Sequence, residues 1–154
     1  MSNTDYFDSS ALVKRYMAEM GSAWVQTRIN DASRVIVTTD LARVEIAAAL
    51  AGKLRGREIA REAYQQARER LTTDIQKRYQ IVPVMSQRID EAIELTACHR
   101  LRGYDAVHLA CALHVNRLLL ANELPPLILV AADDDLLKAA CAAGLETIDP
   151  NLNE

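Results

Sequence analysis

Cysteine is scarce in this sequence, and its cysteines form no cross-linking or metal-binding pattern. The 154 residues include three, Cys98, Cys111 and Cys141, each in an apolar stretch with helical spacing and none in a CxxC pair. An odd number without such pairs argues against a disulfide framework and against a thiolate zinc site. We therefore predict buried free thiols in a reducing compartment.

Histidine and glycine are also too few, or wrongly spaced, for two common kinds of site. The three histidines, His99, His108 and His114, do not follow the HExxH pattern or any Cys-His zinc spacing. The five glycines form neither GxxxxGK[ST] nor GxGxxG, so no loop of the kind that cradles nucleotide phosphates is predicted. Zinc enzymes and nucleotide-dependent enzymes with such loops are thereby disfavoured.

Long apolar segments are missing as well. No run is long enough to cross a bilayer, and the first residues lack the basic and apolar regions of a signal peptide. We therefore expect a cytoplasmic protein without a membrane partner. The formal net charge of -3 leaves nucleic-acid binding open, because the local distribution of charge decides that.

The composition that remains is that of one ordinary globular domain over residues 1–154, with half of the residues hydrophobic. Short β-branched or aromatic runs, which predict strands, alternate with stretches of helical periodicity. The predicted strands are 6–7, 34–38, 80–84, 127–130 and 147–148. Pro83 suggests an edge strand, and the very apolar run 127–130 a strand covered on both faces. This alternation predicts a three-layer α/β/α sandwich with a mainly parallel central sheet.

Two aspartates follow predicted strands directly. Asp8 comes after the strand 6–7, ahead of a helix for which Ser9 or Ser10 offers an N-cap, and Asp133 comes after the strand 127–130. The carboxyl ends of parallel strands share one rim of the sheet, and ligands bind there. We therefore expect both carboxylates on that rim, with Asp135 as the second choice in the run 133–135.

Two further acids lie on predicted helices. Asp105 opens the apolar stretch 103–113, where it could simply cap the helix or point toward the rim. Glu45 has Leu41, Ala48 and Ala49 as neighbours on its helix face, so it points toward apolar surroundings. A carboxylate there needs a partner, either a distant basic residue or a metal ion. We expect His108 to be a packed helix histidine.

Four acids on one rim would repel each other, and a divalent cation would remove that repulsion. Carboxylate-rich, all-oxygen sites suit Mg²⁺ or Mn²⁺. Such sites handle phosphoryl groups, so hydrolysis of a nucleic-acid backbone is the predicted chemistry. The candidate metal and catalytic residues are Asp8, Glu45, Asp105 and Asp133, with Asp135 as an additional candidate ligand.

Basic residues that could contact a phosphate backbone occur in two places. Lys14 and Arg15 follow Asp8, and Lys53 and Arg55 end the helix that carries Glu45. The alternative is an ordinary solvated face, which we favour for the more distal basic residues up to Arg78.

Four blocks of the sequence resemble the PIN domain, specifically the VapC-type ribonuclease toxins. They are YFDSSALVKRY (6–16), ARVEIAAAL (42–50), LRGYDAVHLA (101–110) and VAADDDLL (130–137). The acidic quartet of that family maps onto Asp8, Glu45, Asp105 and Asp133. The resemblance implies a metal-dependent endoribonuclease acting on RNA, a homodimer, and inhibition by a small antitoxin that covers the acidic site.

One departure from the family pattern concerns the fourth aspartate. Ala131 and Ala132 stand where the family often has a threonine or serine, so a hydroxyl that could orient a ligand is missing and activity could be weaker. The alternative to an enzyme is a PIN-like scaffold that only binds RNA or a partner. The presence of all four carboxylates favours the enzyme.

Overall fold

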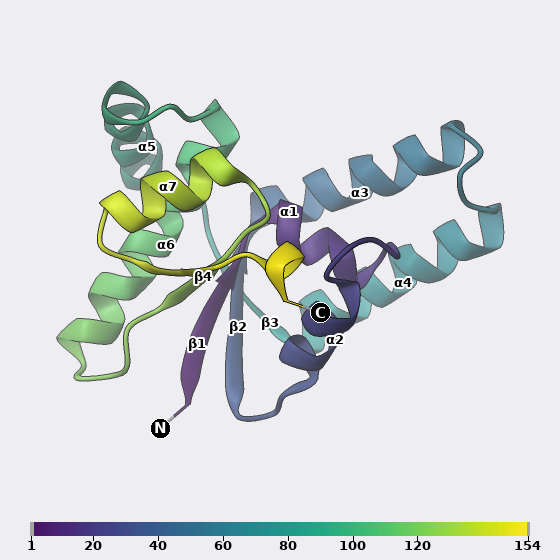
Figure 1. Ribbon diagram of the computed structural model, residues 1–154, viewed down its shortest axis with the longest axis horizontal. Coiled ribbons are helices and arrows are strands. Elements are labelled where there is room, and N and C mark those ends of the chain that lie inside the picture. The colour runs from purple at the N-terminus through teal and green to yellow at the C-terminus, as the bar shows by residue number, and fades with distance from the viewer. Residues whose placement is uncertain (1, 154) are drawn as a thin grey trace.

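The computed structural model describes residues 2–153, and a five-stranded sheet forms its centre (Figure 1). The strands are β1 (Asn3–Phe7), β2 (Arg34–Thr39), β3 (Tyr79–Val82), β4 (Ile128–Val130) and β5 (Glu146–Ile148). They lie in the order β3-β2-β1-β4-β5, and every neighbouring pair is parallel. The predicted α/β class is confirmed. Strand β3, which precedes Pro83, is an edge strand, and β4 lies between two others.

Helices cover both faces of the sheet. They are α1 (Ser9–Leu12), the 3-10 turn η1 (Val13–Arg15), α2 (Ser22–Asn30), α3 (Asp40–Arg55), α4 (Arg61–Lys77), α5 (Ser86–Cys98), α6 (Gly103–Ala121), α7 (Asp134–Ala142) and the 3-10 turn η2 (Pro150–Leu152). Helices α5 to α7 gather on one side and α1 to α4 on the other, where α3 and α4 run side by side out beyond the sheet (Figure 1). The result is the predicted three-layer sandwich.

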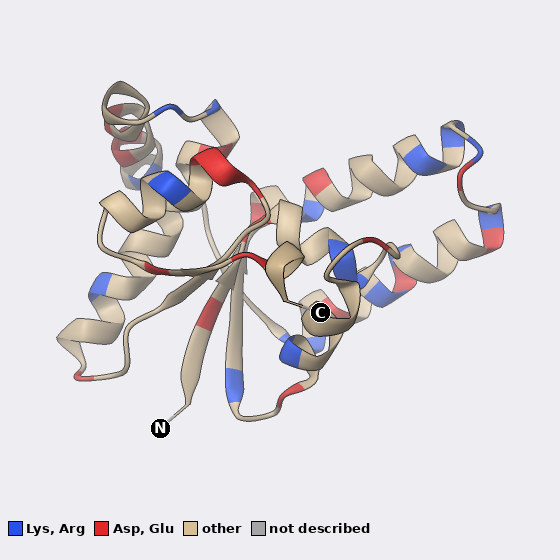
Figure 2. Ribbon diagram, in the orientation of Figure 1, with Lys and Arg blue, Asp and Glu red and all other residues tan. Residues whose placement is uncertain are grey.

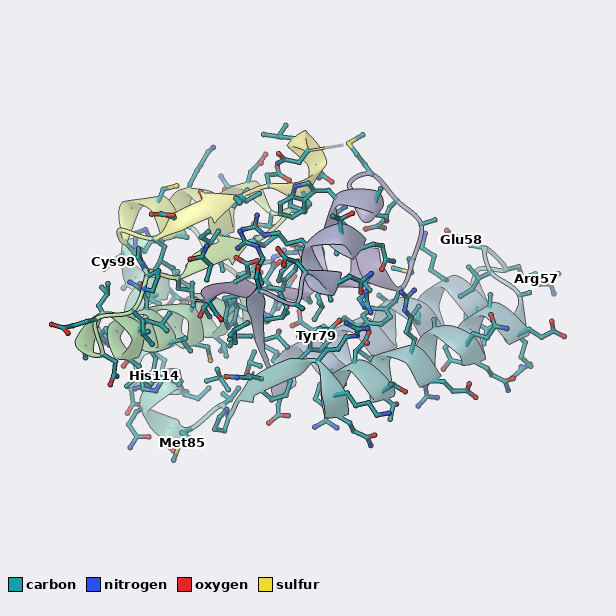
Figure 3. All side chains as sticks on the ribbon, turned by 90° about the horizontal axis from the view of Figure 1, so that it is seen from below. Arg57, Glu58, Tyr79, Met85, Cys98 and His114 are labelled. Atoms are coloured by element: carbon teal, nitrogen blue, oxygen red, sulfur yellow. The ribbon has the colours of Figure 1, made fainter. Side chains whose placement is uncertain are left out.

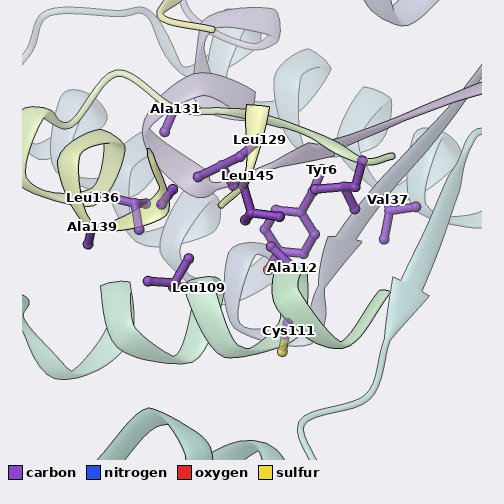
Figure 4. Packing of buried hydrophobic residues seen from close by; sticks show 12 residues of the cluster. Tyr6, Val37, Leu109, Cys111, Ala112, Leu129, Ala131, Leu136, Ala139 and Leu145 are labelled. Atoms are coloured by element: carbon purple, nitrogen blue, oxygen red, sulfur yellow. The ribbon is translucent and has the colours of Figure 1, made fainter. Parts of the chain in front are cut away.

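The core consists of two apolar layers, one on each face of the sheet. Tyr6 of β1 points toward α6 and packs with Leu109, Leu129 and Leu136 (Figure 4). Its neighbour Phe7 points to the opposite face and packs with residues of α1, α2 and α3. The alternation follows from the two-residue period of a strand, and it places α6 and α3 at fixed positions on opposite sides of β1.

The cysteines agree with the prediction in being free but only partly in being buried. All three cysteines are free, as predicted, but only Cys111 is buried. Cys98 and Cys141 are exposed, because each lies at or near the C-terminal end of its helix on the solvent side, so the prediction of burial was wrong for them.

Within residues 2–153, no helix has the length and apolar character needed to span a membrane.

Candidate active site

The sheet order creates a crevice between two strand ends. β1 and β4 are neighbours, and the chain leaves them toward opposite edges of the sheet, which is the arrangement where α/β folds bind ligands. Asp8 follows β1 and Asp133 lies three residues beyond the end of β4. The backbone N–H of Asp8 donates to the carbonyl of Val130 at 3.2 Å, so the two strand ends are joined there.

Asp8 is almost fully buried and is itself the N-cap of α1. Its side chain accepts from the Ala11 N–H at 3.1 Å and from the Ser10 hydroxyl, which lies 2.7 Å from each carboxylate oxygen. The prediction of a serine cap was wrong, because the aspartate reaches the free N–H groups first. Burial raises the pKa of Asp8 to about 6.

Ser10 also forms a hydrogen bond to the segment that follows β4, on the other side of the crevice. Its hydroxyl accepts from the Ala132 N–H at 2.9 Å while donating to Asp8. One serine therefore ties the β1–α1 turn to the segment between β4 and α7. The sequence prediction missed Ser10 as a site residue, although its position two residues after Asp8 was a local signal.

Glu45 of α3 faces Asp8 and Asp105 across a cavity of about 410 Å³. Its Oε2 accepts from the Ser9 hydroxyl at 2.9 Å, and its Oε1 lies 2.7 Å from His108 Nε2. The distant partner that the sequence left open is therefore His108, which is fully buried on α6. The cavity wall between the acids is apolar and includes Val13, Met17, Ala48, Ala49 and Tyr104.

Asp105 and Asp133 are bridged by one guanidinium. Arg102 Nε lies 2.9 Å from Asp105 Oδ2, and Arg102 Nη2 lies 3.0 Å from Asp133 Oδ2. Arg102, not Asp105, occupies the N-cap position of α6, and no side chain caps that helix end. Asp105 therefore does not act as the N-cap, although it lies in the first turn of α6, at the positive end of the helix dipole, as predicted. Burial raises the pKa of Asp105, and the guanidinium of Arg102 opposes that rise.

A second cavity, of about 570 Å³, lies on the other side of Arg102. Asp105, Asp133 and Asp135 all line it. Asp133 uses Oδ1 to cap α7, accepting from the Leu136 N–H at 2.9 Å, whereas Asp135 is half-exposed and lies 3.8 Å from Arg100. Asp105 and Arg102 line both cavities, so Arg102 divides the acidic crevice into two parts.

The donor set fits a hard divalent cation. Carboxylate oxygens are the ligands that Mg²⁺ and Mn²⁺ prefer, and a cationic group already lies between two of the carboxylates. Within residues 2–153, no three ligand side chains converge closely enough to form a ready metal cluster. A metal ion at Asp105 and Asp133 would therefore take the place of the Arg102 guanidinium.

The basic residues predicted to contact RNA are not at this crevice. Arg15 is buried and forms a two-pronged ion pair with Asp74 of α4, at 2.7 and 3.2 Å, so the prediction that it contacts phosphate was wrong. Lys14 is also buried and pairs with Glu19. Lys53 and Arg55 lie at the end of α3, near the hairpin tip marked by Arg57 and Glu58 in Figure 3.

A comparison with protein families decides what kind of domain carries this crevice. The family model of the PIN domain matches residues 6–141. This chain belongs to the PIN domain family. Two curated relatives from Mycobacterium tuberculosis strains, Ribonuclease VapC45 and Ribonuclease VapC49, are each 32% identical to it over 148 residues, covering 96% of both chains.

Solved structures resemble this PIN domain throughout its length. PAE2754 from Pyrobaculum aerophilum superimposes with a TM-score of 0.64 at 19% identity, covering 99% of this chain and 93% of that one. VapC20 from M. tuberculosis, described as a sarcin-ricin loop cleaving toxin, gives 0.62 at 15% identity, covering 92% and 95%. A toxin-antitoxin complex from Klebsiella pneumoniae gives 0.54 at 16% identity, covering 95% and 97%. At these identities the likeness confirms the fold.

Proposed function

We propose that this PIN domain is the toxin of a toxin–antitoxin pair, a cytoplasmic endoribonuclease that hydrolyses single-stranded RNA with Mg²⁺ or Mn²⁺. The observation that carries the proposal is the meeting of four carboxylates from separate segments at the β1–β4 crevice. Asp8, Glu45 and Asp105 share one cavity, and Arg102 links Asp105 to Asp133. The ribonuclease names of the two 32% identical relatives support the activity.

In this proposal Asp8, Glu45, Asp105 and Asp133 hold the metal, with Asp135 as the further candidate. When bound, a divalent cation supplies an activated water and stabilises charge on the phosphodiester oxygens. Ser10 and the Ala11 N–H keep the Asp8 carboxylate oriented. Arg102, once released from Asp105 and Asp133, presents a planar donor group that suits a phosphate.

The RNA would approach over the exposed arginines next to the crevice. The side chains of Arg100 and Arg102 are 93% and 62% exposed, and both line the second cavity. Lys53 and Arg55 lie eight and ten residues beyond Glu45 along α3, roughly 12–15 Å away at the rise of an α-helix. Figure 2 shows both signs of charge at that tip, where Lys53 pairs with Glu58. We propose that Arg100 and Arg102 contact the reacting strand and that Lys53 and Arg55 contact only RNA that extends beyond the crevice.

The test is cleavage of a labelled single-stranded RNA by purified antitoxin-free protein supplied with Mn²⁺. Asp8→Asn and Asp105→Asn should reduce cleavage to background, because each removes a charged metal ligand. Arg100→Ala should raise KM severalfold, and Arg55→Ala should leave it unchanged. The matched control is Asp134→Asn, which removes an exposed carboxylate from the same acidic run.

Intact RNA after long incubation of the Mn²⁺-loaded wild-type protein would contradict the proposal. RNA retention in a gel-shift assay under the same conditions would then identify the alternative, a PIN-like scaffold that binds RNA without cleaving it.

We also propose a small antitoxin partner and a homodimer. The apolar wall beside Asp8 offers a partner segment a surface directly over the acids. Apolar side chains exposed on α5 and α6, among them Ile93 and Leu118, offer surface for a second copy. Light scattering of the isolated protein should give twice the mass of one chain, and a monomer at micromolar concentration would contradict the dimer.

A further inference from the structure

A chain of hydrogen bonds runs from the core to the candidate active site through His108. Tyr6 Oη lies 2.9 Å from His108 Nδ1, and His108 Nε2 lies 2.7 Å from Glu45 Oε1. The Ser9 hydroxyl completes the chain by donating to Glu45 Oε2 at 2.9 Å. Tyr6 and His108 are fully buried, whereas the Glu45 side chain is 21% exposed. Only the Glu45 end of this chain therefore reaches solvent, inside the acidic cavity.

We propose that His108 is a positioning residue for Glu45: its imidazole donates from Nε2 to the carboxylate, accepts at Nδ1 from Tyr6, and so holds the carboxylate toward the divalent cation. The inference rests on the proposed metal-dependent function, to which it adds a role for a residue that touches neither metal nor RNA. The inference is based on the juxtaposition of Tyr6, His108 and Glu45, which come from β1, α6 and α3.

The tautomer follows from counting hydrogens. An ionised carboxylate only accepts, so His108 Nε2 must carry the proton in the bond to Glu45. With Nδ1 unprotonated, it accepts the hydrogen of Tyr6 Oη, and every polar hydrogen in the chain has an acceptor. An imidazolium would donate from both nitrogens and leave the Tyr6 hydrogen unpaired in the core, which is unfavourable. Burial also raises the pKa of Tyr6 far above its ordinary value, so that hydrogen stays in place.

The ring cannot easily turn away from this arrangement. The Tyr6 and His108 rings meet edge to face, with centroids 5.9 Å apart and planes at 76°. Figure 4 shows the Tyr6 side chain directed from β1 at α6, between residues that fill the core. Because the surrounding interior is packed, a change in ring orientation would require the neighbours to move.

One helix thereby sets the positions of two acids. α6 carries Asp105, and His108 lies one turn further along the same helix. Asp105 reaches the cavity directly, and Glu45 is tied to the same helix through His108. Without these two hydrogen bonds, the partly exposed Glu45 side chain could sample several rotamers. Holding both of its oxygens removes that freedom before a metal ion binds.

The decisive experiment compares His108→Gln with His108→Asn. A glutamine amide nitrogen reaches the position of Nε2 and keeps the bond to Glu45, whereas an asparagine amide reaches only the position of Nδ1, on the Tyr6 side. Mn²⁺ affinity is measured by calorimetry on metal-free protein, with urea unfolding of each variant alongside. We expect His108→Asn to weaken Mn²⁺ binding by about 10-fold or more, and His108→Gln to stay within about threefold of wild type.

Two controls separate positioning from a merely structural role. Leu109→Val loosens the same helix core without touching Glu45, so it should lower stability and leave Mn²⁺ affinity unchanged. Nitrogen NMR of ¹⁵N-labelled wild-type protein should show one protonated and one unprotonated ring nitrogen for His108, with the proton on Nε2. Tyr6→Phe removes the donor to Nδ1 but not the acceptor of the Nε2 proton, so this variant should keep the proton on Nε2.

Equal Mn²⁺ affinities in wild type, His108→Asn and His108→Gln would overturn the inference, as would a proton on Nδ1 in the wild-type protein. Failure of the wild-type protein to bind Mn²⁺ at all would instead contradict the proposed function. The two failures are thus distinguishable.

Discussion

Asp8 combines burial with a negative charge more fully than any other proposed ligand. Its pKa of about 6, against an ordinary value of 3.8, means that the folded protein binds a proton more tightly than the unfolded chain does. The contribution of Asp8 to the unfolding free energy of the metal-free protein therefore falls as pH rises from about 4 to about 6, and stays at the lower level above that range. A metal ion would reverse this penalty, because the ionised carboxylate would then have a counter-charge.

Asp8→Asn should accordingly stabilise the metal-free protein at pH 7.5. The shift of about two pH units corresponds to roughly 3 kcal/mol, and the variant should recover most of it, since asparagine is also a good N-cap. Urea unfolding in EDTA at pH 5.0 and 7.5 checks this. The difference between variant and wild type at pH 5.0 should be about half of that at pH 7.5, because pH 5.0 lies midway between the two pKa values. A difference independent of pH would contradict the assignment.

Removing the charge of Arg102 should strengthen metal binding, although Arg102 lies within the candidate active site. It supplies the charge that neutralises Asp105 and Asp133 in the metal-free protein. Arg102→Gln should therefore tighten Mn²⁺ binding by about fivefold, the value of roughly 1 kcal/mol for two ion pairs made by a largely exposed guanidinium. Calorimetry measures the affinity, and Arg100→Gln, which alters a single long contact to Asp135, is the control. Unchanged or weaker binding in Arg102→Gln would show that the guanidinium does not compete with the metal.

At the scale of single elements, local patterns predicted where the four acids lie but not which residues they pair with. Position after a strand predicted Asp8 and Asp133, and the apolar neighbours of Glu45 on α3 predicted its inward direction. Arg102 lies only three residues before Asp105. This spacing could have predicted the ion pair, but the sequence prediction missed it. His108 lies 63 residues from Glu45, and spacing along the chain carries no information about such a contact.

Arg15 is a basic residue whose partner is also distant in the sequence, so its role was predicted wrongly. Its place a few residues after Asp8 suggested a phosphate contact. Its partner Asp74 is 59 residues away on α4, where Tyr16 also donates to the carboxylate at 2.7 Å. This buried network joins η1 to α4 and thus fixes the base of the α3–α4 pair. A buried ion pair of this kind specifies how elements meet more than it adds to stability.

At the scale of the whole molecule, the alternation of strands and helices predicted a common rim but not the strand order. The order β3-β2-β1-β4-β5 is what makes β1 and β4 neighbours and so brings residues 8 and 133 together. That order depends on which strands pair across long stretches of chain, and periodicity within each stretch cannot reveal it.

The rim has an apolar side and an acidic side, and this asymmetry leads to a prediction about inhibition. Ala48 on α3 lines the apolar wall beside Glu45, facing Met17 and Tyr104 across the cavity. An antitoxin segment that covers the acids must lie against this wall. Ala48→Arg should block it by bulk while keeping a charge that RNA tolerates, so cleavage should continue and inhibition should weaken at least about 10-fold, or about 1.4 kcal/mol.

The inhibitor for this assay is the proposed antitoxin, purified and added to the toxin in the RNA cleavage reaction. Ala63→Arg is the matched control, because it places the same side chain on the exposed face of α4, outside the cavity. It should leave both cleavage and inhibition unchanged. Full inhibition of Ala48→Arg would show that the partner reaches the acids without using the apolar wall. Loss of cleavage without a loss of stability would instead place Ala48 on the path of the RNA.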